Sequence, residues 1–261
     1  MPSSVEYTRL DESMVITPLL SFEEFSDFYC NEYKPFLKSG SAIEWCLEED
    51  MNGAYAYSAV DASTGMDVVF LAQLPTDYAD AFLIAHEISH VMLKARGLSY
   101  KINSPPGYEI VAQNIQSLLE DPIVDSCLQG TYGFDLLEFY LNKCIPDGRK
   151  FINMYPGESY INDIDKLANT FCYAGEILKW ELIDDDAAMR EWREYQLLHD
   201  RTYPTISRRG KELASFAILR GYDTPKKRKR LAKIIIRIYN LYNILDIAEY
   251  PSILSYPFWR Q

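Results

Sequence analysis

The sequence predicts an α+β protein in which α-helices predominate, and three observations support this fold class. Two runs rich in β-branched and aromatic residues, 53–60 and 66–74, lie on either side of the turn-rich segment DASTG, a pattern typical of a β-hairpin. The apolar stretch ADAFLIAHEISHVMLKARG (79–97) follows and predicts a long helix. Most of the chain after it has a helical pattern, so the predicted sheet is small and lies near the N-terminus.

The first elements can be placed from caps and turn residues. A helix is expected at about 21–37, capped by Ser21 and with two glutamates in its first turn. After the hairpin, Pro75 ends the second strand, Thr76 or Asp77 caps the helix over 79–97, and Gly97 ends that helix.

The rest of the chain is predicted to be mainly helical. A loop at 103–107 (NSPPG) precedes a second long helix, expected at about 108–129 with an interruption at Pro122. Further helices are expected at about 133–144, 159–183, 186–200, 206–220 and 225–247. The segments PDGRK (146–150) and MYPGESY (154–160) are candidate linkers. They predict a core over 1–145 and a helical region over 146–261 that packs on it without folding independently.

Charge and composition limit the kinds of partner. The net charge of −12 argues against nucleic acid or an anionic membrane as partner, and we interpret the basic run PKKRKR (225–230) as an exposed helix face. The N-terminus lacks the pattern of a secretory signal, and Lys233 and Arg237 interrupt the most apolar late stretch. The five cysteines are scattered, as expected of reduced thiols. These features predict a cytoplasmic protein; the oligomeric state stays open.

The polar residues of the helix over 79–97 have the spacing of a metal site. His86 and His90 are four residues apart with Glu87 beside the first, in a chain that has only three histidines. Residues four apart differ by about 40° around a helix, so both imidazoles project from one face and can bind one Zn²⁺. Glu87, rotated by about 100°, lies beside the metal as a general base. Zinc lowers the pKa of its bound water to about 7, which suits attack on an amide carbonyl.

The surroundings of these three polar groups favour the same interpretation. Their neighbours on the helix are nearly all apolar, which predicts burial. Buried polar groups need partners, and one metal ion would satisfy all three.

In this context the segment HEISH, preceded by a strand and an apolar helical turn, resembles the zincin metallopeptidases. The resemblance implies a zincin-like core within 1–145 and zinc-dependent hydrolysis of a peptide or protein substrate. It also implies that 66–74 is the edge strand that pairs with an extended substrate.

A third protein ligand is needed, and the sequence offers several. The extended motif HExxHxxGxxH is absent, so a glutamate from the next helix is expected, as in gluzincins. Glu109 has the spacing of aminopeptidase-type gluzincins, with 18 intervening residues after His90, but an acid is also expected there to complement a helix N-terminus. Glu120, flanked by apolar residues, is preferred. His199 is the distant alternative.

Two further resemblances bear on this choice. NIQSLLEDPIVD is similar to the acid-bearing element of metallopeptidases linked to cobalt-chelatase and von Willebrand-type domains, which implies Glu120 as the ligand. YEIVAQNIQSLLEDP is loosely similar to the ImmA/IrrE-type peptidases, which would make Glu109 the ligand. Asp121 or Asp125 could orient a ligating histidine.

The sequence therefore predicts a gluzincin-like metallopeptidase in which His86, His90 and Glu120 bind Zn²⁺ and Glu87 is the general base. His199 and Tyr203 are candidates for stabilising the oxyanion. Two alternatives stay open: a non-catalytic zincin-like regulatory or binding protein, and an effector protease that cleaves one intracellular protein.

Overall fold

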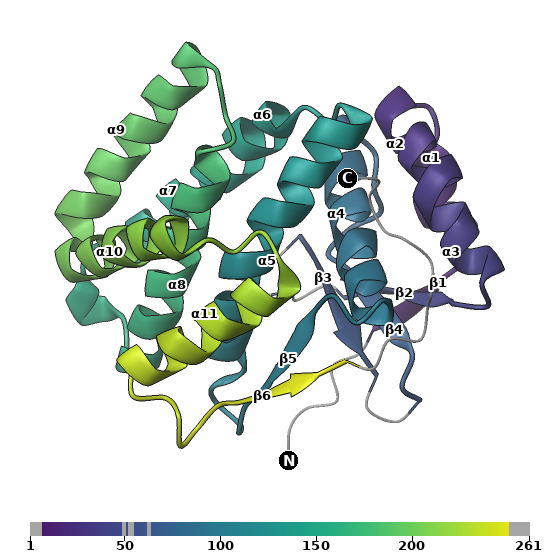
Figure 1. Ribbon diagram of the computed structural model, residues 1–261. Helices are drawn as coiled ribbons and strands as arrows, with labels where there is room; N and C mark the ends of the chain where they lie inside the picture. The colour runs from purple at the N-terminus through teal and green to yellow at the C-terminus, as the bar shows by residue number, and fades with distance from the viewer. Residues whose placement is uncertain (1–6, 49–50, 52–54, 62–63, 251–261) are drawn as a thin grey trace.

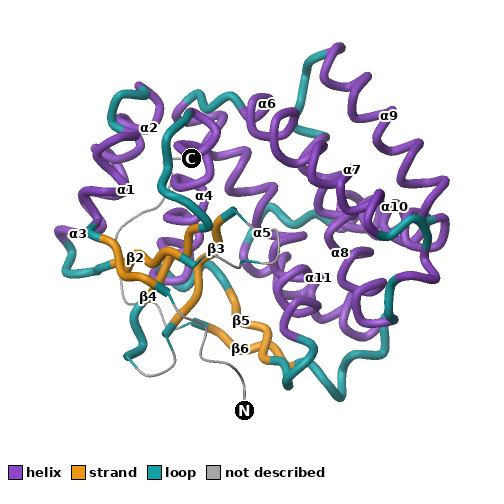
Figure 2. The backbone as a smooth tube through the Cα atoms, turned by 180° about the vertical axis from the view of Figure 1, so that it is seen from behind, coloured by secondary structure: helices purple, strands orange, loops and turns teal. Residues whose placement is uncertain are grey.

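The computed structural model describes residues 7–48, 51, 55–61 and 64–250. The chain is α+β and mostly helical. Figure 1 shows a small sheet and the N-terminal helices on one side, two long helices in the centre, and the late helices on the other side; Figure 2 shows the same arrangement from behind.

The main sheet has four strands in the order β1-β2-β4-β3. They are β1 (Thr8–Leu10), β2 (Ile43–Leu47), β3 (Ala56–Val60) and β4 (Asp67–Leu71), with only the β2–β4 pair parallel. The expected hairpin is confirmed, because β3 and β4 pair antiparallel with Val60 opposite Asp67. The prediction that 66–74 is an edge strand was wrong. β4 lies inside the sheet, as suits its buried apolar run, and β3 forms the edge.

The N-terminal helices are α1 (Glu12–Leu19), α2 (Glu23–Phe28) and α3 (Lys34–Lys38), with a π-helical turn η1 (Tyr29–Tyr33) joining the last two. The helical stretch expected at 21–37 is therefore present. Its expected cap is not, because Ser21 Oγ donates to the carbonyl of Pro18 instead, at 3.0 Å.

The helix that carries the histidines has the predicted ends. α4 (Tyr78–Ala95) begins after Asp77, whose side chain accepts from the amide of Asp80, and Asp80 closes the capping box. Gly97 follows the helix with φ 66°, a conformation that favours glycine. Nearly every residue of α4 is buried.

The second long helix, α5 (Glu109–Tyr132), contains Pro122 without being interrupted by it, so the expected break was wrong. A proline removes the hydrogen bond to the carbonyl four residues earlier, here that of Leu118. Packing holds the helix together at this point, because α8 (Asp163–Trp180) approaches closely through Gly175. A Cβ atom on Gly175 would lie 3.3 Å from the Cα atom of Leu118.

The remaining elements complete the helical side of the molecule. They are β5 (Tyr100–Asn103), α6 (Leu136–Phe139), the π-helical turn η2 (Tyr140–Cys144), α7 (Ile145–Met154), the 3₁₀ turn η3 (Glu158–Tyr160), α9 (Asp186–Thr202), α10 (Pro204–Arg220), α11 (Pro225–Ile238) and β6 (Asp246–Glu249). The linker expected at 146–150 lies inside α7, where Pro146 occupies the first turn, a position that tolerates proline. The last helix ends earlier than expected, and β6 pairs with β5.

The buried core does not divide at 145/146. One hydrophobic cluster runs from Val15 to Ile206 and the other from Tyr100 to Leu245, so each mixes residues from both sides of that boundary. The proposed domain division stays a prediction. The basic run at 225–230 is not wholly exposed either, because Arg228 is buried and donates to the carbonyl of Leu98 at 2.9 Å. None of the described helices is both long and apolar enough to span a bilayer.

Candidate metal centre

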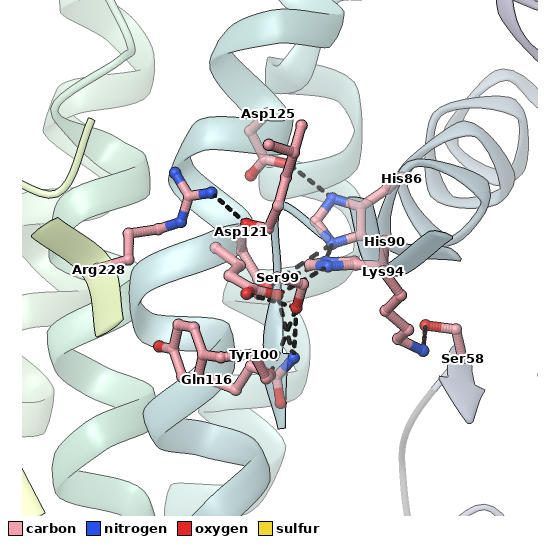
Figure 3. A network of polar contacts seen from close by, with 12 residues as sticks. Ser58, His86, His90, Lys94, Ser99, Tyr100, Gln116, Asp121, Asp125 and Arg228 are labelled. Carbon is pink, nitrogen blue, oxygen red and sulfur yellow. Dashed lines mark hydrogen bonds and ion pairs between the residues drawn. The ribbon is translucent and has the colours of Figure 1, made fainter. Parts of the chain in front are cut away.

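Helices α4 and α5 bring three potential ligand atoms together (Figure 3). The Nε2 atoms of His86 and His90 are 3.0 Å apart, and Asp121 Oδ1 lies 3.9 Å from the first and 3.2 Å from the second. His86, His90 and Asp121 are a group of residues that could hold a metal ion.

The donor set and its spacing suit zinc. Two imidazole nitrogens and a carboxylate oxygen, each about 2.0–2.2 Å from a tetrahedral ion, would lie about 3.3 Å from one another, close to the separations found here. Asp121 Oδ1 is buried, and among the described residues it forms an ion pair with His90 Nε2 at 3.2 Å but accepts no hydrogen bond of good geometry. A buried carboxylate oxygen without a good hydrogen bond is costly, and a cation at this point would satisfy it.

Asp125, one turn beyond Asp121 on α5, fixes the orientation of the first histidine. Its Oδ1 atom lies 2.7 Å from His86 Nδ1, and its other oxygen accepts from the hydroxyl of Tyr140. An ionised carboxylate only accepts, so Nδ1 of His86 carries the hydrogen and Nε2 presents its lone pair to the other candidate ligands. Asp125 therefore makes the contact with His86 that would orient a ligating ring, and the role of His86 as a ligand stays a prediction.

Glu120 does not occupy the place expected of the third ligand. Its Oε2 atom lies 3.6 Å from Nδ1 of His90, the ring nitrogen that faces away from the other candidate ligands. Its two oxygens accept hydrogen bonds from Ser99 Oγ at 2.7 Å and Gln116 Nε2 at 3.1 Å. Adjacent residues differ by about 100° around a helix, so only one of Glu120 and Asp121 can face the Nε2 atoms directly. The structure turns Asp121 toward them.

The other candidates lie elsewhere. Glu109 is exposed and accepts from the amide of Gly107 at the start of α5, as an acid at a helix N-terminus is expected to do. His199 is buried in the helical region, stacked on Tyr173 and bonded to Ser207 Oγ at 2.6 Å. Tyr203 donates to the carbonyl of Tyr155. The cleft beside the histidines is not lined by Glu109, His199 or Tyr203.

His90 and Asp121 form a charged pair that is largely, though not fully, shielded from solvent. Burial lowers the pKa of His90, but the neighbouring carboxylates of Asp121 and Glu120 outweigh it and raise that pKa to about 10. Burial raises the pKa of Asp121, but His90 and His86 outweigh it and lower that pKa to about 2. Each group therefore favours the charged form of the other, as expected of opposite charges a few ångströms apart.

A cleft of about 380 Å³ opens beside this cluster. One wall is β3, all of whose residues line the cleft, and the other is formed by α4 and α5. A second cavity of about 170 Å³ is lined in part by Phe82, Phe139 and Tyr140. Glu87, which is buried, lines both cavities together with His86 and Asp121. Glu87 is therefore beside the cluster, as predicted from its place in the motif.

Sequence reasoning missed several residues of this site. It gave Asp121 only an orienting role, and it did not single out Ser99, Gln116, Tyr140 or Lys94. The available signal was the spacing of Asp121 and Asp125, which matches the spacing of the two histidines.

Comparison of the chain with protein-family models, with curated proteins and with solved structures finds no match.

Proposed function

We propose that this protein is a zinc-dependent hydrolase that cleaves peptide bonds in the cleft between β3 and α4. The observation that carries the proposal is the convergence of His86 Nε2, His90 Nε2 and Asp121 Oδ1 beside Glu87 in an open cleft. Zinc bound by these three atoms would supply a Lewis acid that activates water and polarises a carbonyl.

The residues of the chain would share the remaining work. Glu87 takes the proton from the attacking water and delivers it to the leaving nitrogen, as a carboxylate beside the metal can. Asp125 holds the His86 ring in place through its bond to Nδ1. Glu120, held by hydrogen bonds from Ser99 and Gln116, places a negative charge near Nδ1 of His90.

The edge strand supports a peptide as substrate. Among the described residues β3 pairs with β4 alone, and its residues line the cleft. An extended peptide could add to this edge through main-chain hydrogen bonds, which would hold a scissile bond near Glu87 without specifying sequence.

Glu87→Gln tests the catalytic role. The substitution keeps the size of the side chain but removes the base, so the purified variant should retain zinc and lose at least about 10²-fold in the rate of peptide cleavage. A variant that keeps its zinc and the wild-type rate would refute the role of Glu87. A wild-type protein that binds zinc and cleaves no peptide would instead favour the non-catalytic regulatory or binding protein.

The ligand set is tested by zinc content after three substitutions. Asp121→Ala should abolish stoichiometric zinc, whereas Glu109→Ala should keep it fully and Glu120→Ala should keep it with weakened affinity. If Asp121→Ala retains zinc and Glu120→Ala or Glu109→Ala loses it, the ligand assignment is wrong. Thermal unfolding of each variant separates loss of zinc from loss of fold.

A further inference from the structure

Lys94 is a buried lysine in the wall of the same cleft. It follows His90 by four residues on α4 and therefore lies on the same helix face, one turn along. Its side chain is 9% exposed, yet it lines the cleft between β3 and α5. Figure 3 shows it extending from α4 toward Ser58 of β3.

The ammonium of Lys94 has only distant partners. Its Nζ atom lies 3.4 Å from Ser58 Oγ and 4.0 Å from Asp67 Oδ1, with no closer polar partner among the described residues. A good bond between an ammonium and a carboxylate is about 2.7–2.9 Å long. Asp67 is a poor counter-ion, because burial raises its pKa, while burial also lowers the pKa of Lys94.

Two other lysines of similar burial show what the fold normally provides. Lys143, 12% exposed, lies 3.0 Å from Asp80, and Lys179, 14% exposed, lies 2.7 Å from Glu176. Each has a carboxylate at hydrogen-bond distance. Lys94 is the most buried of the three and has no carboxylate at hydrogen-bond distance among the described residues. The free-energy cost of removing its charge from water is therefore the least offset.

The charges that line the cleft sum to a positive value when a divalent ion is present. Lys94, Lys101 and the ion contribute +4, Glu87, Glu120 and Asp121 contribute −3, and histidines that bind the ion are neutral. The sum is then +1. The two lysines lie outside the candidate ligand set, so they stay available to an anion in the metal-loaded cleft.

We propose that Lys94, assisted by Ser58, forms a subsite that binds a carboxylate of the substrate next to the scissile bond. The proposal rests on the proposed hydrolase function for its position beside the reacting atoms. The hydroxyl of Ser58 can accept from Lys94 and donate to the same carboxylate, which would fix the substrate along β3. The carboxylate would come from an acidic side chain or from the C-terminus of a peptide.

A series of dicarboxylates tests the subsite without requiring turnover. Succinate, glutarate, adipate and pimelate, each paired with the monocarboxylate of equal length, are titrated into the zinc-loaded full chain by calorimetry. One end can bind at the metal and the other at Lys94. At least one dicarboxylate should bind about tenfold more tightly than its monocarboxylate, since one charge-assisted bond is worth about this factor.

Lys94→Met is the decisive variant, and Lys143→Met is its matched control. Methionine fills the space of the lysine stem without a charge, and replacing a poorly paired buried charge in this way is often tolerated. The dicarboxylate preference should fall to within about twofold in Lys94→Met and persist in Lys143→Met. Equal affinities of the wild type and Lys94→Met for every member of the series would overturn the proposal.

Peptide cleavage then separates the two sources of the carboxylate. The wild type and both variants digest a mixture of proteome-derived peptides, and mass spectrometry identifies the cut bonds. Aspartate or glutamate at one fixed position from the cut identifies the acidic side chain, and a fixed distance from the peptide end identifies the C-terminus. Either preference should disappear in Lys94→Met alone. Cleavage with a preference that is unchanged in Lys94→Met contradicts the subsite. A wild type that binds zinc but cleaves no peptide contradicts the proposed function, and the titration of the zinc-loaded chain still decides the subsite. A wild type that binds no zinc contradicts both.

Discussion

Replacement of Asp125 by asparagine perturbs the metal centre without removing a candidate ligand. The Asp125 side chain is 1% exposed and accepts from His86 Nδ1 at 2.7 Å and from the Tyr140 hydroxyl. Asparagine has nearly the same volume, but its amide oxygen can accept fully from only one of these donors. Its NH₂ group then faces the other donor, and the negative charge that supports the His86 ring is lost.

The size of the effect follows from this geometry. Loss of a carboxylate that orients a ligating histidine costs about 10–100-fold in metal affinity, or about 1.4–2.7 kcal/mol. The lower end is expected for Asp125→Asn, because the amide oxygen can keep the bond to His86. The upper end is expected for Asp125→Ala, which leaves the ring free to turn.

Competition with a chromophoric chelator at fixed pH measures the zinc dissociation constant of each variant. Glu120→Gln is the matched control, because Glu120 is also buried on α5 and lies 3.6 Å from the Nδ1 atom of His90. Its oxygens are held by Ser99 and Gln116, so we expect a change within about threefold. Wild-type affinity in Asp125→Asn, or an equal loss in Glu120→Gln, would refute the assignment of Asp125 as the residue that orients His86.

Three further predictions concern stability. Chelation of zinc should lower the thermal midpoint of the wild type by about 10 °C, since an ion at a thousandfold excess over its dissociation constant adds about 4 kcal/mol, and should leave Asp121→Ala unchanged. Burial lowers the pKa of His199 to about 4, so the unfolded chain binds more protons between pH 6.5 and 4, and stability is lost as the pH falls through that range. Between pH 7.5 and 5 this one residue should account for about 2 kcal/mol of the loss in the free energy of unfolding, and urea unfolding of His199→Gln should show a loss smaller by that amount. Gly210→Ala should cost about 1–3 kcal/mol in the same assay, because its Cβ atom would lie 2.8 Å from Tyr173 Cδ1, whereas Ser215→Ala, exposed on the same helix, should cost little. A wild-type midpoint insensitive to chelator, equal pH sensitivity of His199→Gln, or a neutral Gly210→Ala would contradict the respective argument.

Local signals in the sequence were sufficient for the hairpin and for α4. The turn DASTG between two β-rich runs predicts the β3–β4 pair, and Asp77 and Gly97 predict the ends of α4. These features depend on interactions between residues that are close together in the chain, so residue types alone predict them. The break expected at Pro122 failed for the opposite reason. The close approach of α8 at Gly175 stabilises α5 there, and that contact lies more than fifty residues away in the chain.

The edge strand could not be inferred from the hairpin alone. Both 53–60 and 66–74 have the composition of strands, and either could have lain at the edge. β4 is internal because β2, which precedes the hairpin in the chain, pairs with it in parallel, for example at Trp45 and Val69. That contact joins segments separated in sequence, so the composition of the hairpin does not reveal it. Apolarity was the only local hint, since the more apolar run is the internal one.

The choice between Glu120 and Asp121 depends on how α5 is rotated about its axis. Contacts along the two central helices run in opposite directions, with His86 beside Asp125 and His90 beside Asp121. A spacing of four residues rises about 6 Å on either helix, so two histidines four apart on α4 can match two aspartates four apart on an antiparallel α5. Glu120 has no acidic residue at the corresponding spacing and could match only one histidine. The matching spacing of the two histidines and the two aspartates therefore identifies Asp121, which the apolar surroundings of a single acid do not. This spacing can be interpreted from the sequence only if α4 and α5 are assumed to pack antiparallel.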